Sequence, residues 1–135
     1  MTDKELLLLA IEAREASYSP YSSFMVGAAL LTRDGKVYTG ANIENAAYTP
    51  TICAERVAFF KAVNNGERDF TAIAVVGGKR GEPISGLCAP CGVCRQVMAE
   101  FCKDDFKIIA GTPDNIKTYT LEQILPDYFG PKDLA

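Results

Sequence analysis

The sequence of 135 residues contains no histidine. Without an imidazole, the chain can form neither a Ser-His nor a Cys-His nucleophile pair, and no imidazole can bind a metal. It also lacks an apolar run of about 18 residues, because the apolar stretch 6–11 lies among Lys4, Glu5 and Glu12. We therefore expect neither a membrane span nor a cleavable signal peptide. We expect the protein to be cytoplasmic.

Clusters of basic residues are absent as well. Fourteen Lys and Arg stand against 17 Asp and Glu, so the formal net charge is −3. A net anion without a Lys/Arg cluster holds a nucleic acid backbone poorly, and nucleic acid is not an expected partner. With 48% hydrophobic and 23% charged residues, the length and composition instead fit one compact domain over residues 1–135.

Hydrophobic periodicity predicts alternating helices and strands. In chain order, the expected elements are a helix from Thr2 to about Ala16, strands 24–31 and 37–42, a helix over 53–63, a strand over 70–76, a loop over 77–86, a helix from Pro90, strands 107–110 and 116–120, and a short helix capped by Thr120. This order predicts an α/β protein in which helices cover a mixed sheet.

Five cysteines stand at positions 53, 88, 91, 94 and 102. The number is odd, and without a secretory signal such close spacing indicates metal or redox chemistry before it indicates disulfides. Cys102 fits a buried core thiol.

Three of the cysteines stand at predicted helix starts. Cys91 and Cys94 form a Cys-x-x-Cys after Pro90, and Cys53 begins the helix over 53–63. A helix amino terminus stabilises an anion, so both places suit thiolate metal ligands. If the two helix starts face each other, three thiolates converge on one Zn²⁺, and the fourth tetrahedral position remains open for water, as in catalytic zinc sites.

Glu55 follows Cys53 by two residues. Residues two apart on a helix do not share a face, so we expect Glu55 beside the metal and outside its coordination shell. A carboxylate in that place can take a proton from water and pass it to a leaving group.

Other interpretations compete with this one. A lone Cys-x-x-Cys is also typical of redox pairs. Cys88, Cys91 and Cys94 have the spacing of a bacterial iron–sulfur run, but Met98-Ala99 stands where the fourth cysteine and a proline are required. A structural zinc site that uses Cys88 as a fourth ligand stays open on spacing alone.

Five segments in a fixed order resemble the cytidine deaminases, in particular their small homotetrameric form with three cysteine ligands. The segments are 24–29 (FMVGAA), 40–45 (GANIEN), 51–56 (TICAER), 90–96 (PCGVCRQ) and 125–131 (LPDYFGP). The resemblance covers nearly the whole chain and implies a three-layer α/β/α sandwich with a five-stranded mixed sheet.

The resemblance also implies a role for individual residues. Cys53, Cys91 and Cys94 would bind one Zn²⁺ per chain, and Glu55 would shuttle protons. Asn42 and Glu44 would hold the ribose hydroxyls, Phe24 would pack against the pyrimidine, and the Ala54 backbone would face the base. Phe129 and Tyr48 would reach a neighbouring subunit's site. Arg56 would donate to a ligand sulfur. This has its own physical logic, because Zn²⁺ with three thiolates keeps a net negative charge that an Arg offsets.

We therefore expect hydrolytic deamination of cytidine and 2′-deoxycytidine, in pyrimidine salvage, by a homotetramer with shared sites. The nearest alternative within this chemistry is a deaminase of the blasticidin S type. The alternative from another class is a non-catalytic zinc module that mediates assembly. Polynucleotide editing is disfavoured by the acidic balance.

Overall fold

The computed structural model describes residues 1–84 and 86–135. The strands are β1 (Phe24–Thr32), β2 (Val37–Ala41), β3 (Phe70–Lys79), β4 (Lys107–Thr112) and β5 (Asn115–Thr120). The helices are α1 (Asp3–Ala13), α2 (Ala54–Asn64), α3 (Gly92–Phe101) and α4 (Leu121–Ile124), with short 3₁₀ turns at Arg14–Ala16 and Pro131–Asp133. Among these helices, none combines the length and the apolar character that crossing a membrane requires.

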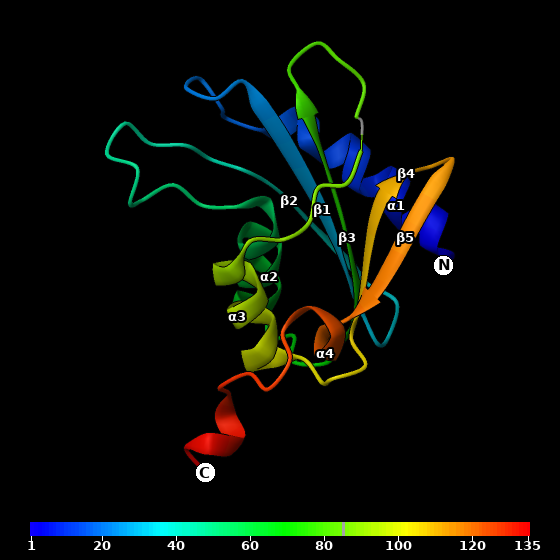
Figure 1. The fold of residues 1–135 in the computed structure, drawn as a ribbon, viewed down its shortest axis with the longest axis vertical. Coiled ribbons are helices and arrows are strands. Elements are labelled where there is room, and N and C mark those ends of the chain that lie inside the picture. The colour runs from blue at the N-terminus through cyan, green and yellow to red at the C-terminus, as the bar shows by residue number, and fades with distance from the viewer. Residues whose placement is uncertain (85) are drawn as a thin grey trace.

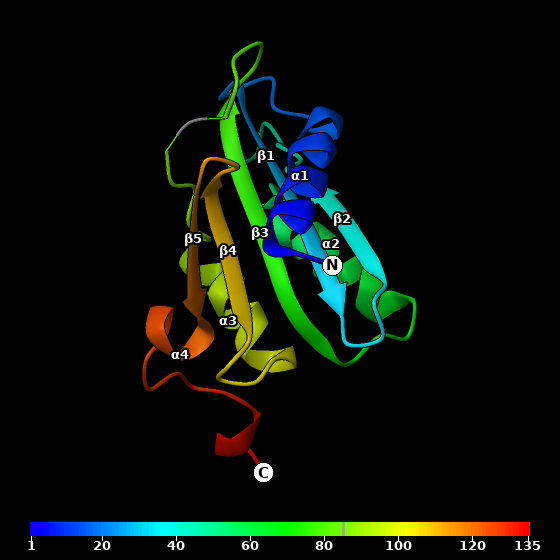
Figure 2. The same cartoon turned by 90° about the vertical axis from the view of Figure 1, so that its right-hand side faces the viewer.

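The five strands form one mixed sheet in the order β2-β1-β3-β4-β5 (Figure 1). β1 pairs antiparallel with β2 and β3, β3 pairs parallel with β4, and β4 pairs antiparallel with β5. A parallel pair needs a crossover, and α3 supplies it between β3 and β4. α1 covers one face of the sheet, whereas α2 and α3 cover the other (Figure 2). The expected α/β sandwich with a five-stranded mixed sheet is confirmed.

Two apolar clusters fill the space between the layers, because successive strand residues point to opposite faces. On the α1 side the sheet contributes Ala29, Ala72, Ala74, Val76 and Ile109. On the α2 and α3 side it contributes Ala28, Leu30, Ile73, Val75 and Ile108. Phe59 of α2 lies at the centre of this second cluster, with ring centroids 5.3 Å from Phe70 and 6.1 Å from Phe106.

Gly40 of β2 lets the first turn of α2 approach the sheet closely. A Cβ atom at this position would overlap the Ala54 carbonyl oxygen and come within 2.7 Å of the Ala58 amide nitrogen. The backbone of α2 therefore rests directly on β2. This contact sets the position of Cys53 and Glu55 at the start of that helix.

One sequence expectation about the strands was wrong. We expected a loop from residue 77, but β3 continues through Gly77 and Gly78, which pair with Val26 and Met25 of β1. A Cβ atom at Gly77 would lie 2.7 Å from the Phe24 ring. The two glycines thus serve close packing and not a turn.

Candidate metal centre and adjoining pocket

The starts of α2 and α3 meet at a cluster of three thiols. Cys53 and Cys91 occupy the N-cap positions of these helices, and neither side chain makes a capping hydrogen bond. The Sγ atom of Cys91 lies 3.6 Å from that of Cys53 and 3.5 Å from that of Cys94. All three Sγ atoms lie within 4.8 Å of one another. The three predicted ligands are therefore brought together.

The spacing and the chemistry of this cluster fit a zinc ion. Zn–S bonds of about 2.3 Å in a tetrahedron place sulfur atoms about 3.8 Å apart, within a few tenths of an ångström of the shorter distances observed. No fourth Cys, Asp or Glu side chain of the described residues belongs to the group. Three thiolates with one open position form the donor set of a catalytic zinc site.

The pKa values of Cys53 and Cys94 shift in opposite directions. A hydrogen bond from Cys94, assisted by Arg56, lowers the pKa of Cys53 to about 5. The same hydrogen bond and burial raise the pKa of Cys94. Cys53 is thus the thiolate that these contacts favour, and a divalent cation bound to the cluster would favour ionisation of Cys94 as well.

Arg56 lies beside the cluster, as expected. Its Nη2 donates to the Sγ atom of Cys53 at 3.4 Å, and this interaction raises the pKa of the guanidinium. Its Nε is buried without a hydrogen-bond partner in the described part of the chain. The guanidinium thus places positive charge against a ligand sulfur, where it offsets excess negative charge.

Glu55 is buried next to the thiols without being one of them. Its side chain is only 3% exposed. Burial, reinforced by the negative charge of Cys53, raises the pKa of the carboxyl to about 7. A carboxyl group with such a pKa can both accept and donate a proton near neutral pH.

Cys88 lies outside the thiol cluster. Its Sγ and the Phe24 ring both pack over Gly77, since a Cβ atom there would lie 2.8 Å from that Sγ. Burial raises the pKa of the Cys88 thiol to about 11. The structure therefore does not form the four-cysteine site that the spacing had left open.

Asn42, directly after β2, uses most of its amide to hold neighbouring backbone. Its Oδ1 accepts hydrogen bonds from the Val26 amide and the Ser17 hydroxyl, and its Nδ2 donates to the Phe24 carbonyl at 2.9 Å. One N–H of the side-chain amide is left for another partner. Asn42 thus connects β1 to the segment before it.

Glu44 lines a pocket of about 380 Å³, a volume within the range of small-molecule sites. The pocket is lined by Tyr21, Ser22, Glu44, Asn45, Tyr48 and Thr51. Hydrogen bonds from Ser22, followed by the Tyr21 amide, lower the pKa of the Glu44 carboxyl. Of the expected substrate-binding residues, Glu44 and Tyr48 therefore share one pocket.

The other expected residues lie as follows. Ala54 is fully buried as the first residue of α2, and Phe24 begins β1 with its side chain 39% exposed. Tyr48 and Phe129 are 76% and 61% exposed. Phe129 is held through its carbonyl, which accepts from Gln96 of α3 at 2.7 Å.

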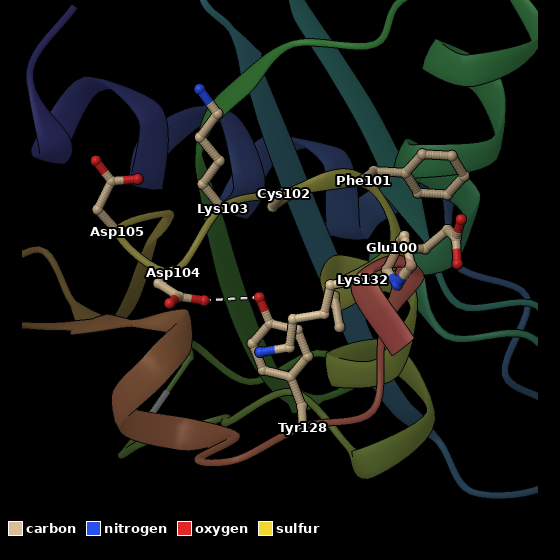
Figure 3. A pocket seen from close by; sticks show the side chains of 10 residues that line it. Glu100, Phe101, Cys102, Lys103, Asp104, Asp105, Tyr128 and Lys132 are labelled. Atoms are coloured by element: carbon tan, nitrogen blue, oxygen red, sulfur yellow. Dashed lines mark hydrogen bonds between the residues drawn. The ribbon is translucent and has the colours of Figure 1, made fainter. Parts of the chain in front are cut away.

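A second hollow, of about 570 Å³, lies where α3 ends and the carboxy-terminal segment packs (Figure 3). Within it the Tyr128 hydroxyl donates to Asp104 at 2.6 Å, and the Lys132 ammonium lies 5.0 Å from the centroid of the Tyr128 ring. None of the expected site residues lines this hollow. Its contacts secure the tail that carries Phe129.

Sequence reasoning missed the residues that hold Asn42 and Glu44. Ser17, Tyr21 and Ser22 lie in a segment that we interpreted only as the end of the first helix. A signal was present, because a Ser-Pro-Tyr-Ser turn offers free hydroxyl and amide donors just before a strand.

Comparison with known proteins supports the same chemistry. Residues 1–110 match the family described as the zinc-binding region of cytidine and deoxycytidylate deaminases. The chain is 51% identical to a cytidine deaminase from Halalkalibacterium halodurans over 134 residues, which cover 98% of each chain. It is 32% identical to a blasticidin-S deaminase from Bacillus cereus, over 92% of this chain and 89% of that protein. The crystal structure of cytidine deaminase from Burkholderia pseudomallei superposes with a TM-score of 0.87 at 45% identity, covering 96% of this chain and 100% of that one.

Proposed function

The chain belongs to the family of cytidine and deoxycytidylate deaminases, and from this we propose that it hydrolyses cytidine and 2′-deoxycytidine to uridine and 2′-deoxyuridine with release of ammonia. The observation that carries the proposal is the convergence of Cys53, Cys91 and Cys94 beside the buried Glu55. This arrangement pairs a metal site that has an open position with a group able to move protons.

Cys53, Cys91 and Cys94 would hold the zinc ion, and Arg56 would offset the charge of their thiolates. When bound, zinc supplies the activation of the water that attacks C4 of the pyrimidine ring. Glu55 would take one proton from that water and pass it to N3 of the ring. It would then take the second proton from the hydroxyl group added at C4 and pass it to the amine, so that the C4 carbonyl forms as ammonia leaves. Its raised pKa suits both directions of transfer.

The remaining site residues bind the nucleoside. Ionised Glu44 only accepts hydrogen bonds, so it suits the sugar hydroxyls, which donate them. The free N–H of Asn42 offers a donor to a sugar oxygen. Phe24 packs against the pyrimidine ring, and the backbone at Ala54 faces the base. The pocket at Glu44 and the exposed ring of Phe24 support these assignments.

The active form is a homotetramer in which subunits share their sites. The exposure of Tyr48 and Phe129 supports this assembly, because both rings are free to contact a neighbouring subunit. The protein acts in the cytoplasm, in pyrimidine salvage.

A blasticidin-S-type deaminase is the second candidate within the same chemistry. The higher identity to a cytidine deaminase, 51% against 32%, favours cytidine. The third candidate is a structural zinc module that binds the metal but catalyses no reaction.

One experiment separates these candidates. Zinc per chain is measured on the purified protein, and the fall in absorbance of cytidine and of blasticidin S is followed in parallel. We expect one zinc ion per chain and turnover of cytidine. Turnover of blasticidin S alone would support the second candidate, and zinc without turnover of either compound would support the structural module.

A further inference from the structure

The segment between α1 and β1 holds Glu44 through three hydrogen bonds. The amides of Tyr21 and Ser22 donate to Glu44 Oε1 at 3.0 and 3.1 Å, and the Ser22 hydroxyl donates to Oε2 at 2.5 Å. Tyr21 donates only through its backbone amide, whereas Ser22 donates through both its amide and its side chain. Both oxygens of the carboxylate are thereby fixed before any substrate arrives.

The same hydroxyl also contacts the other half of the nucleoside site. Ser22 Oγ accepts a hydrogen bond from the Phe24 amide at 2.9 Å. Phe24 is the first residue of β1 and carries the ring expected against the pyrimidine. A single hydroxyl group therefore connects the sugar-binding carboxylate to the residue that packs on the base.

The number of hydrogen bonds at Glu44 leaves room for a substrate. A carboxylate offers about four acceptor positions. Two are taken on Oε1 by backbone amides and one on Oε2 by Ser22. The remaining position on Oε2 can accept a hydrogen bond from a sugar hydroxyl, and its direction depends on where Ser22 holds that oxygen.

We infer that Ser22 is a positioning residue for the sugar of the substrate, acting through Glu44. The inference rests on the proposed function, because it requires that Glu44 accept a hydrogen bond from a sugar hydroxyl. Ser22 is exposed, so removal of its hydroxyl leaves no cavity in the core. Its effect on activity therefore reports hydrogen bonding and not packing.

The test compares cytidine with 2′,3′-dideoxycytidine, which lacks both secondary sugar hydroxyls. In Ser22→Ala we expect kcat/KM for cytidine to fall about 10-fold, mainly through KM, as for the loss of a hydrogen bond to a charged group. We expect less than about a twofold change for the dideoxy analogue, since it lacks the secondary hydroxyls that would donate a hydrogen bond to Glu44. An equal fall for both nucleosides would overturn the inference.

Two further variants serve as controls. Ser22→Thr keeps the hydroxyl and should restore the preference for cytidine. Ser23 follows Ser22 in the chain, and its hydroxyl makes no hydrogen bond with the described residues. Ser23→Ala should therefore leave kcat/KM unchanged for both cytidine and the dideoxy analogue.

Glu44→Gln separates failure of this inference from failure of the proposed sugar contact. If Glu44→Gln keeps the native preference for cytidine over the dideoxy analogue, the sugar contact itself is wrong. If Glu44→Gln loses the preference for cytidine but Ser22→Ala keeps it, only the role of Ser22 is wrong. In the double variant, the Ser22 change should add less than about a twofold effect to that of Glu44→Gln, because the two residues act through one contact.

Discussion

At the scale of single residues, Glu55 allows the clearest separation of chemistry from metal binding. Its carboxyl is buried beside the thiols but is not one of the converging ligands. Glu55→Gln keeps the shape of the side chain and removes its ability to carry a proton. We expect native folding and one zinc ion per chain, with turnover reduced at least about 10²–10⁴-fold. Metal analysis and a cytidine assay on the same sample check this, and loss of zinc would contradict the assigned role.

Cys88 and Cys91 test the ligand set in the same way. Cys88 packs with Phe24 over Gly77, whereas the Cys91 Sγ atom lies 3.6 Å from the sulfur of Cys53 and 3.5 Å from that of Cys94. We expect Cys88→Ser to retain zinc and activity and Cys91→Ser to lose both. Zinc content and turnover of the purified variants decide the matter. A zinc-free Cys88→Ser protein would show that the site has four cysteine ligands.

The charge of Glu44 predicts a preference for nucleosides over nucleoside 5′-monophosphates. A phosphate about 6 Å from the carboxylate, at an effective dielectric near 20, is repelled by about 3 kcal/mol per charge, or roughly 100-fold in binding. Arg80 is a cation that acts on Glu44, but it contributes least among the groups that lower the pKa of this carboxyl, so it offsets little of the repulsion. We therefore expect kcat/KM to be much higher for cytidine than for cytidine monophosphate, and this gap to narrow in Glu44→Gln. Equal efficiency on both substrates in the native protein would contradict the assignment.

The sequence reveals a functional residue only where the local pattern around that residue indicates its role. The thiols could be found because a metal needs particular atoms at particular spacings, and helix-start signals placed those atoms. The Ser-Pro-Tyr-Ser turn marks Ser22 as a free donor but does not reveal what it binds, because its partner Glu44 lies 22 residues away in the chain. Serine in a turn looks the same whether its hydroxyl meets water or a carboxylate.

At the scale of helices and strands, local patterns predicted the order of elements and the sheet class correctly. These patterns ended β3 too early, because a Gly-Gly pair is a local loop signal. In the fold, Gly77 and Gly78 instead pair with β1, and Gly77 packs against Cys88. Sequence periodicity describes one element at a time. Close approach between two elements therefore remains hidden until the fold brings them together.

Gly40 provides a prediction at this scale. A Cβ atom there meets the backbone of α2, which cannot move without moving Cys53 and Glu55. We expect Gly40→Ala to lower the free energy of unfolding by about 1–3 kcal/mol and to weaken zinc binding in the protein that still folds. Chemical denaturation and competition with a zinc chelator measure the two effects.

Gly27→Ala is the matched control for this prediction. Its added Cβ would meet the backbone of Ala10 in α1 and of Arg14 in the 3₁₀ turn that follows, on the opposite face of the sheet. We expect similar destabilisation, with zinc affinity unchanged in the folded fraction. If the two variants weaken zinc binding equally, the effect would be general instability and not displacement of α2.

At the scale of the whole molecule, the proposed homotetramer with shared sites predicts complementation between two defective subunits. Glu55→Gln removes the proton shuttle, and Phe129→Ala removes a side chain expected to complete a neighbour's site. In a mixed tetramer, a subunit that keeps Glu55 can lie next to one that keeps Phe129, so some sites are complete. We expect co-expression to give more activity than the sum of the two variants made alone. Sedimentation that shows an active monomer would rule out the assembly.

The separation of the ligands along the chain also determines when the metal site can form. Cys53 and Cys91 are 38 residues apart, and between them the chain must complete α2, cross the sheet as β3 and return to begin α3. Closing so long a segment precedes any gain from the contacts it makes. We therefore expect zinc to be captured late and not to initiate folding, in contrast to small domains whose ligands are close in sequence. During refolding, far-UV circular dichroism should recover before a coloured zinc indicator reports uptake of the ion.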